Sequence, residues 1–426
     1  MNNKTTKRLV GNTVMLYLMT IAKIVIPLIS LPYLTRVLSV DCYGSVSFVK
    51  SLVAYLQILI DFGFLLSATK EIIRSNQING NADEAISNAF YAQTMLAFLA
   101  QIIMVICAFT FPILKGLELF AILSAVAAGL SILWFEYIFK AYEKMGKIAI
   151  RVIVVKSVAL VLTLLFVKSD KDIILMPIFD IIASLIATIF VFIELKKLNV
   201  KVRLNFKNLK GALKSLGNSF VYFISNFATT AFGALNTLLI GAFLLKSDVA
   251  FWSLAMQLVT AIQSFYSPII NSVHPVMLKE KNLNYIHKIL MIYMPIIFVG
   301  CAIIVFAGDW IVSFAFTDKY LTSAALLKYM IPVLIFSFPG MLYGWPTLDA
   351  IDKTKQTTFT TILSAVVQVV GLCFLALIGQ FNLIGLAIAR NVSEITLCAS
   401  RMIVCYKNKA LFVKPSVVLE ENKIEG

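Results

Sequence analysis

The stretch that decides the fold is "GNTVMLYLMTIAKIVIPLISLPYL", residues 11–34. It is longer than the roughly 20 apolar residues that one helix needs to cross a hydrocarbon core of about 30 Å. Its one charged residue, Lys23, stands four residues before Pro27. The same spacing returns in "KYMIP", residues 328–332, within another apolar run. The first segment is too long for the core of a cleavable signal peptide, so we expect it to remain as a spanning helix.

The composition extends this prediction to the whole chain. Of 426 residues, 60% are hydrophobic and 14% are charged, and the mean hydropathy is +0.90. These are too few polar residues to cover a water-soluble globule of this size, so the sequence predicts an all-α polytopic membrane protein. We expect twelve transmembrane helices, at 10–35, 45–66, 88–111, 117–139, 152–167, 173–193, 216–245, 249–273, 289–308, 323–346, 357–378 and 383–405.

The formal net charge of +15 is explained by topology. If the N-terminus is cytoplasmic, most of the 37 lysines and arginines fall in cytoplasmic segments. This is the positive-inside pattern, and it places both termini in the cytoplasm. A nucleic-acid partner is therefore not needed to explain the basic excess.

A basic stretch, "ELKKLNVKVRLNFKNLKGALKS" at 194–215, divides the twelve spans into two sets of six. It is either an amphipathic helix on the membrane surface or a solvated basic loop. "KSLGNS" (214–219) directly after it is similar to "RLVGNT" (8–13), as expected of a duplicated transporter. The predicted parts are an N-terminal six-helix lobe at 1–193, a cytoplasmic linker at 194–215, a C-terminal six-helix lobe at 216–405 and a cytoplasmic tail at 406–426.

Residues that carry catalytic chemistry are scarce. There are two histidines, His274 and His287, and no spacing typical of metal ligands, a phosphate-binding loop or an activated nucleophile. A membrane polymerase or glycosyltransferase would need acids, bases or a metal gathered outside the hydrocarbon. We therefore expect a transporter rather than an enzyme, with no metal site and no cofactor.

Charged residues inside the predicted spans are the best functional clues. Such a residue costs about 2.5–3.5 kcal/mol on insertion scales, so it usually faces a wet cavity or a partner. Basic residues outnumber acids there, which favours an anionic cargo over the organic cations of a drug exporter. The candidate substrate-binding residues are Lys23, Lys328, Arg390, Lys50 and Lys156, and the candidate for coupling to an ion is Asp180.

Simpler interpretations stay open for most of these residues. A lysine near a span end can extend its charge to the interface, which applies to Lys50, Lys156 and Lys328. Arg390 and Glu394 are spaced i, i+4 and can neutralise each other. Asp180 can pair with a lysine or accept a proton. Lys23 lies too deep to extend its charge easily to the interface, which favours a place in a cavity.

The two lysine–proline spacings predict hinges at Pro27 and Pro332. A helical proline lacks an amide hydrogen and frees the carbonyl four residues earlier, here that of Lys23 or Lys328. Irregular backbone at membrane depth is tolerated where it is buried in protein or lines water, which also suits an ammonium group. We therefore expect a hinge beside a cationic site at both places.

Several segments are similar to one known family. "LPYLTRVLSVDCYGSVSF" (31–48), "DFGFLLSATKEIIR" (61–74), "YIFKAYEKMGKIAIRVIVVK" (137–156) and "NLIGLAIARNVSEI" (382–395) resemble the polysaccharide transporters, the Wzx-type O-antigen flippases of the multidrug/oligosaccharidyl-lipid/polysaccharide superfamily. The chain departs from the family's usual residues at Ser39, Tyr137, Lys140 and Ala141. The matching positions that carry charge are Arg36, Asp41, Asp61, Arg74, Glu143, Arg390 and Glu394.

The resemblance implies two six-helix lobes around a central cavity in the bacterial inner membrane. It implies that an undecaprenyl-diphosphate-linked oligosaccharide moves from the inner to the outer leaflet by alternating access, coupled to H⁺ or Na⁺. Membrane lipid and other polysaccharide-assembly membrane proteins are the further partners it implies. A cation-coupled multidrug exporter of the same fold is the alternative function.

Overall fold

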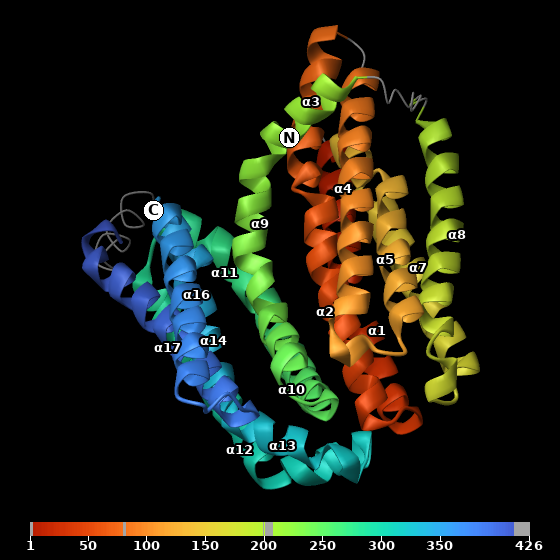
Figure 1. Ribbon diagram of the computed structural model, residues 1–426. Helices are drawn as coiled ribbons and strands as arrows, with labels where there is room; N and C mark the ends of the chain where they lie inside the picture. The colour runs from red at the N-terminus through yellow and green to blue at the C-terminus, as the bar shows by residue number, and fades with distance from the viewer. Residues whose placement is uncertain (1–2, 80–81, 199, 201–207, 413–426) are drawn as a thin grey trace, which may run out of the picture. The chain divides into compact units, whose positions relative to one another are not determined.

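The structure is a computed structural model that describes residues 3–79, 82–198, 200 and 208–412. All regular secondary structure in these ranges is helical, and no strand occurs in them (Figure 1). Eleven helical segments of the described chain are long and apolar enough to cross a membrane. The remaining predicted span, 216–245, lies in a further helix, several of whose side chains are outside the description. The predicted all-α, polytopic class is confirmed.

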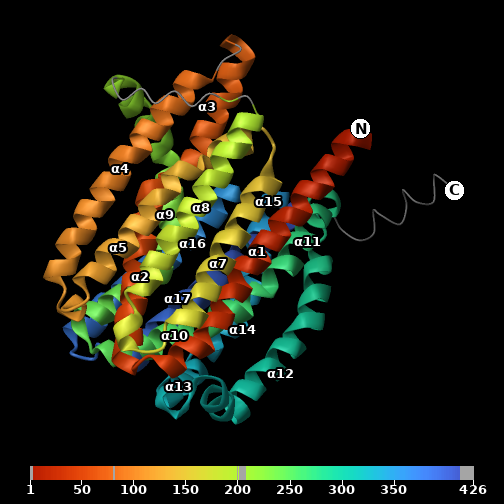
Figure 2. The same ribbon diagram turned by 90° about the vertical axis from the view of Figure 1, so that its right-hand side faces the viewer.

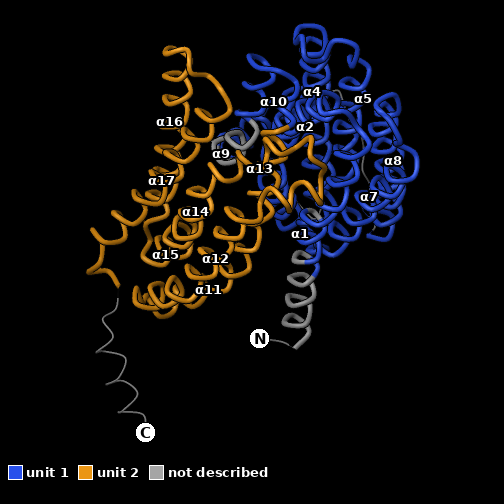
Figure 3. Tube along the Cα trace, turned by 90° about the horizontal axis from the view of Figure 1, so that it is seen from below, with its two compact units in different colours: residues 1–250 blue, residues 251–426 orange. Residues whose placement is uncertain are grey.

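The chain divides into two compact units, Met1–Ala250 and Phe251–Gly426 (Figure 3). The helices of the first unit are α1 Asn3–Val37, α2 Val40–Asp61, α3 Phe64–Asn79, α4 Asp83–Thr110, α5 Glu118–Gly129, α6 Glu136–Ala141, α7 Met145–Phe166, α8 Leu175–Lys197 and α9 Leu209–Phe243, followed by α10 Lys246–Ser264, which crosses the boundary. Those of the second are α11 Tyr266–Glu280, α12 Leu283–Phe316, α13 Leu321–Tyr329, α14 Ile331–Tyr343, α15 Trp345–Ala350, α16 Thr354–Leu377 and α17 Leu383–Lys407.

This division differs from the predicted lobes because α9 belongs to the first unit. It packs along α2, α3 and α4. The hydroxyls of Ser67 on α3 and Ser219 on α9 share a hydrogen bond of 2.6 Å. A Cβ at Gly241 of α9 would lie 2.1 Å from a ring carbon of Phe48 on α2, so only glycine fits there. Residues 199 and 201–207 of the predicted linker and 413–426 of the tail lie outside the described residues.

Two predicted spans are interrupted where the sequence contains no proline. The span at 45–66 breaks after α2, where Phe62 and Gly63 have left-handed φ values of 38° and 78°. The span at 117–139 breaks after α5, where the 3₁₀ helix η2 (Leu130–Trp134) leads to Phe135, with φ 45°. A 3₁₀ segment within a longer helix often marks a functional or strained site.

The two lysine–proline motifs behave differently from each other. The helix α1 continues without interruption through Pro27. The predicted span at 323–346 is broken at Met330, between α13 and α14, and Pro332 stands in the first turn of α14. There the missing amide hydrogen of proline costs no intrahelical bond. The helix break is therefore present at the second motif alone, and hinge movement at either motif stays a prediction.

The helix α7 begins earlier than the predicted span at 152–167. It starts at Met145 and lies beside α1 and α8 (Figure 2). The earlier start brings Arg151, which the sequence analysis placed in a loop, inside the helix. The buried cluster between α3, α4, α6 and α7 is rich in alanine, including Ala85, Ala89 and Ala92. Small residues let helices approach closely where lipid removes the hydrophobic drive for association.

The packing of α9 on α2 gives a stability prediction. Gly241→Ala places a methyl group against Phe48, which is fully buried, and we expect it to destabilise the protein by about 1–3 kcal/mol. Thermal unfolding of the purified protein in detergent measures the change. The matched control is Gly217→Ala on the same helix, where a Cβ meets nothing within 4 Å. Equal loss of stability in both variants would contradict the tight approach of α9 to α2.

Candidate functional site

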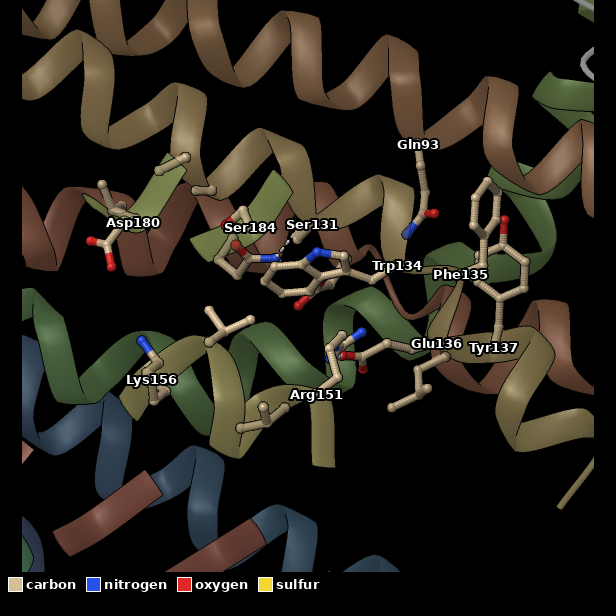
Figure 4. A pocket seen from close by; sticks show the side chains of 18 of the residues that line it. Gln93, Ser131, Trp134, Phe135, Glu136, Tyr137, Arg151, Lys156, Asp180 and Ser184 are labelled. Atoms are coloured by element: carbon tan, nitrogen blue, oxygen red, sulfur yellow. Dashed lines mark hydrogen bonds and ion pairs between the residues drawn. The ribbon is translucent and has the colours of Figure 1, made fainter. Parts of the chain in front are cut away.

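The first unit contains a pocket of about 420 Å³ (Figure 4). Its walls come from the helices α2 to α8 and from the irregular segment between α5 and α6. All of its lining residues lie within the first unit. The volume is within the range of about 300–1,000 Å³ that is usual for small-molecule sites.

Both proline-free helix breaks line this pocket. Gly63 is at the break between α2 and α3, and Trp134 and Phe135 are at the break between α5 and α6. A Cβ at Gly63 would also lie 2.4 Å from the Cβ of Tyr222 on α9, so this position needs glycine for space as well as for its φ of 78°. Left-handed backbone at a non-glycine residue such as Phe135 is strained, and such strain tends to gather at ligand sites.

One end of the pocket, which we call the Lys156 end, carries Lys156 of α7 and Asp180 of α8 on facing walls (Figure 4). The carboxylate of Asp180 interacts electrostatically with Lys156 and with Lys50 of α2. Two ammonium groups therefore share one carboxylate, which leaves a positive excess of one charge.

The opposite end, which we call the Trp134 end, is made by Gln93, Trp134, Phe135, Glu136, Tyr137 and Arg151 (Figure 4). Arg151 is only 2% exposed, and its Nη2 pairs with Oε1 of Glu136. Its guanidinium carbon lies 4.2 Å from the centre of a Trp134 ring, in a cation–π contact. This charge is thus held by one carboxylate and one indole.

The polar wall between the ends is formed by Gln57 of α2. Its amide nitrogen donates to Oδ1 of Asp61 at 2.9 Å and to the hydroxyl of Ser131 at 3.0 Å. Asp61 is one of the positions at which the chain resembles the flippase family. The bond from Gln57 to Ser131 ties α2 to the irregular segment η2.

In the second unit, two predicted substrate-binding residues are paired with carboxylates. Nζ of Lys328 lies 2.6 Å from Oδ2 of Asp309 on α12, an acid that the sequence analysis did not consider. Nη2 of Arg390 lies 2.8 Å from Oε2 of Glu394, as the i, i+4 spacing allowed. Nη1 of Arg390 also reaches Oε1 of Gln368 at 3.5 Å. Neither cation has the uncompensated charge of the Lys156 end.

Of the remaining predicted residues, Lys23 lies in α1, but its side chain is outside the described residues. The structure brings together Lys50, Lys156 and Asp180 in the first unit, and it places Lys328 and Arg390 in the second. The predicted central cavity between the lobes stays a prediction.

Two buried arginines are not among the residues predicted from the sequence. Arg151 lies just before the predicted span at 152–167, although the apolar residues on both sides of it, in "KIAIRVIVV" (147–155), indicate a helix that starts earlier. Arg401 of α17 is 9% exposed and donates to the carbonyl oxygen of Gly340 at 2.8 Å and to the hydroxyl of Thr361 at 3.0 Å. Arg401 joins α17 to α14 and α16 by these hydrogen bonds. Its position near the end of a predicted span gave no indication of these contacts.

Comparison with known proteins identifies relatives along most of the chain. The family described as "Polysaccharide biosynthesis protein" matches residues 9–281. A "Putative O-antigen transporter" of Shigella dysenteriae is 26% identical over 366 residues, which are 84% of this chain and 90% of that protein. A protein of the same description from Escherichia coli (strain K12) is 22% identical over 402 residues, which are 91% of this chain and 94% of that protein.

Solved structures share the fold. The inward-facing conformation of a multidrug resistance MATE family transporter aligns with a TM-score of 0.63 and 13% identity, over 90% of this chain and 98% of that one. Lipid II flippase MurJ in an inward closed conformation aligns with a TM-score of 0.61 and 15% identity, over 92% of this chain and 87% of that one. The likeness confirms the predicted fold of twelve helices in two lobes.

The ion pair at the Trp134 end gives a second stability prediction. Glu136→Gln leaves the guanidinium of Arg151 buried without a counter-charge. We expect a loss of up to about 3 kcal/mol, below that of a fully buried pair because Glu136 is 35% exposed. The double variant Glu136→Gln with Arg151→Met should recover most of the loss.

Thermal unfolding measures both variants against Glu280→Gln, which removes an exposed carboxylate at the end of α11. This control should stay within about 0.5 kcal/mol of the parent protein. If Glu136→Gln is as stable as the control, the pair contributes nothing to the fold.

Proposed function

This chain belongs to the polysaccharide biosynthesis protein family, and we propose that it is a flippase for an undecaprenyl-diphosphate-linked oligosaccharide such as an O-antigen repeat unit. It would move this lipid from the inner to the outer leaflet of the bacterial inner membrane, with both termini cytoplasmic. The two relatives described as putative O-antigen transporters support this class of cargo. In this proposal the chain is a transporter and not an enzyme.

The single observation that carries the cargo assignment is the positive excess at the Lys156 end. Lys50 and Lys156 face one carboxylate, that of Asp180, within membrane-spanning helices. A diphosphate has the opposite charge and oxygen acceptors for both ammonium groups. Because the low dielectric around these helices strengthens such contacts, the cluster favours an anionic headgroup over an organic cation.

The other predicted cations contribute less to binding of the diphosphate in this proposal. Lys328 and Arg390 already have carboxylate partners, so they bind diphosphate only if these pairs open during transport. Lys23 stays a candidate on the sequence argument alone. The sugars would pass through a wet lumen while the polyprenyl tail stays in lipid, as the two lobes alternate between inward-open and outward-open states.

Asp180 is our candidate for coupling to H⁺ or Na⁺. A carboxylate that accepts a proton or a sodium ion stops neutralising the neighbouring ammonium groups, which then attract an anion more strongly. Ion binding at Asp180 and diphosphate binding at Lys50 and Lys156 would therefore favour each other. This gives an electrostatic link between the ion gradient and the cargo.

Deletion of the gene tests the proposed function. In the bacterium that carries it, we expect lipid-linked repeat units to accumulate on the inner leaflet, out of reach of an impermeant sugar-oxidising or lectin reagent. Restoring the gene should return them to the outer leaflet. Repeat units that reach the outer leaflet in the deleted strain would overturn the proposal. If the deleted strain instead loses dye efflux, the result favours the drug exporter.

Two substitutions at the Lys156 end have different expected effects on binding of undecaprenyl diphosphate. Lys156→Gln removes one ammonium group and should weaken binding by about tenfold. Asp180→Asn increases the positive excess, so binding should be equal or tighter, while transport in vesicles should lose its response to an imposed pH or Na⁺ gradient.

Binding is measured with the purified protein in lipid nanodiscs, and Lys279→Gln, at an exposed lysine of α11, is the charge-matched control. Weaker binding in Asp180→Asn, or an unchanged affinity in Lys156→Gln, contradicts the assigned roles.

A further inference from the structure

The Trp134 end of the pocket holds polar atoms that have no hydrogen-bond partner among the described residues. Three are N–H donors, one is a hydroxyl and one is a carbonyl acceptor. They are Nε1 of Trp134, Nε and Nη1 of Arg151, the hydroxyl of Tyr137 and Oε1 of Gln93. A buried polar atom without a partner costs free energy, and five of them at one place indicate that something else fills the pocket.

The burial of these side chains makes the site a built one. Arg151 and Tyr137 are each 2% exposed and Gln93 is 7% exposed. They reach the pocket from α7, α6 and α4, while Trp134 comes from η2. Side chains from four separate elements therefore line this end of the pocket, and each carries a buried hydrogen-bonding atom without a partner among the described residues (Figure 4).

We infer that the Trp134 end is a subsite for one uncharged sugar residue of the lipid-linked glycan. This inference rests on the proposed function and adds to it a place for the sugar that follows the diphosphate. The pocket is continuous from Lys156 to Tyr137, so a headgroup held at the Lys156 end presents its first sugar to the Trp134 end.

The mixture of donors and acceptors fits hydroxyl groups. Each sugar hydroxyl both accepts and donates, so it can accept from the nitrogens of Trp134 and Arg151 and also donate to Oε1 of Gln93. A phosphate offers acceptors alone, and its oxygens would repel the carbonyl oxygen of Gln93. The hydroxyl of Tyr137 suits either a donor or an acceptor.

The charge of the lining also favours an uncharged ligand at this end. Glu136 already neutralises Arg151. The positive excess is at the other end, around Lys156. The rings of Trp134 and Phe135 supply the apolar surface that the C–H face of a sugar ring needs. The two ends therefore suit the two chemically different parts of one headgroup.

Lipid-binding measurements with and without the sugar test this inference. The probes are undecaprenyl diphosphate and the lipid-linked glycan extracted from the gene-deleted strain, each titrated into the full chain in nanodiscs. The parent protein should bind the glycosylated lipid more tightly. Tyr137→Phe, which removes only a hydroxyl, and Gln93→Met, which keeps the length of the side chain, should each reduce this preference by roughly three- to tenfold.

Tyr320→Phe is the matched control, because it makes the same change at a buried tyrosine of the second unit, outside this pocket. It should keep the full preference for the glycosylated lipid. Thermal unfolding confirms that each variant is folded.

Three results would count against the inference or its premise. If the parent protein binds the two lipids with equal affinity, the Trp134 end holds water and not a sugar. The flippase proposal would then remain intact. If both pocket variants keep the full preference for the glycosylated lipid, the sugar binds outside the Trp134 end. Failure of the parent protein to bind either lipid overturns the proposed function as well.

Discussion

The constraint on which this structure depends is that backbone polar groups inside a membrane must find partners within the protein. A spanning helix satisfies this constraint by itself, and a break in the helix does not. The first unit has two breaks, at 62–63 and 130–135, and both open onto the same pocket. The pocket is walled by other helices and has polar side chains in its lining, so irregular backbone is tolerated there. In turn, the break at 130–135 places Trp134, Phe135 and Tyr137 along its wall.

The same constraint applies more strongly to charge. Each deep cation in the second unit that the sequence singled out has its own carboxylate, Asp309 for Lys328 and Glu394 for Arg390. In the first unit, Glu136 neutralises Arg151, but Lys50 and Lys156 share Asp180. An uncompensated charge among spanning helices is costly and is usually kept for function. For this reason we assign the anionic part of the cargo to the Lys156 end.

In the proposed function, one small pocket recognises a headgroup with two unlike parts. Diphosphate needs positive charge, and a sugar needs scattered donors and acceptors beside an apolar surface. The Lys156 end supplies the first, and the Trp134 end supplies the second. A drug exporter for cations would gain nothing from this arrangement, because the positive excess repels its cargo.

The all-α class and nearly every spanning segment follow from the sequence alone, which also singles out Lys50, Lys156 and Asp180 as candidate site residues. These features follow from hydropathy and from the cost of a charge in lipid, which depend on composition along the chain. It also anticipated the pair Arg390–Glu394, since i, i+4 spacing is a local property of a helix.

The tertiary structure alone decided which charges meet and where the helices break. Asp309 and Lys328 come from different helices, and so do Glu136 and Arg151. No local sequence pattern therefore predicts either ion pair. The breaks at Phe62 and Phe135 carry no proline, and their irregular backbone is tolerated because neighbouring helices and the polar side chains of the pocket surround it. Local periodicity specifies a helix, whereas a pocket is a property of several helices brought together. The polar groups of the pocket are tolerated because this assembly shields them from lipid.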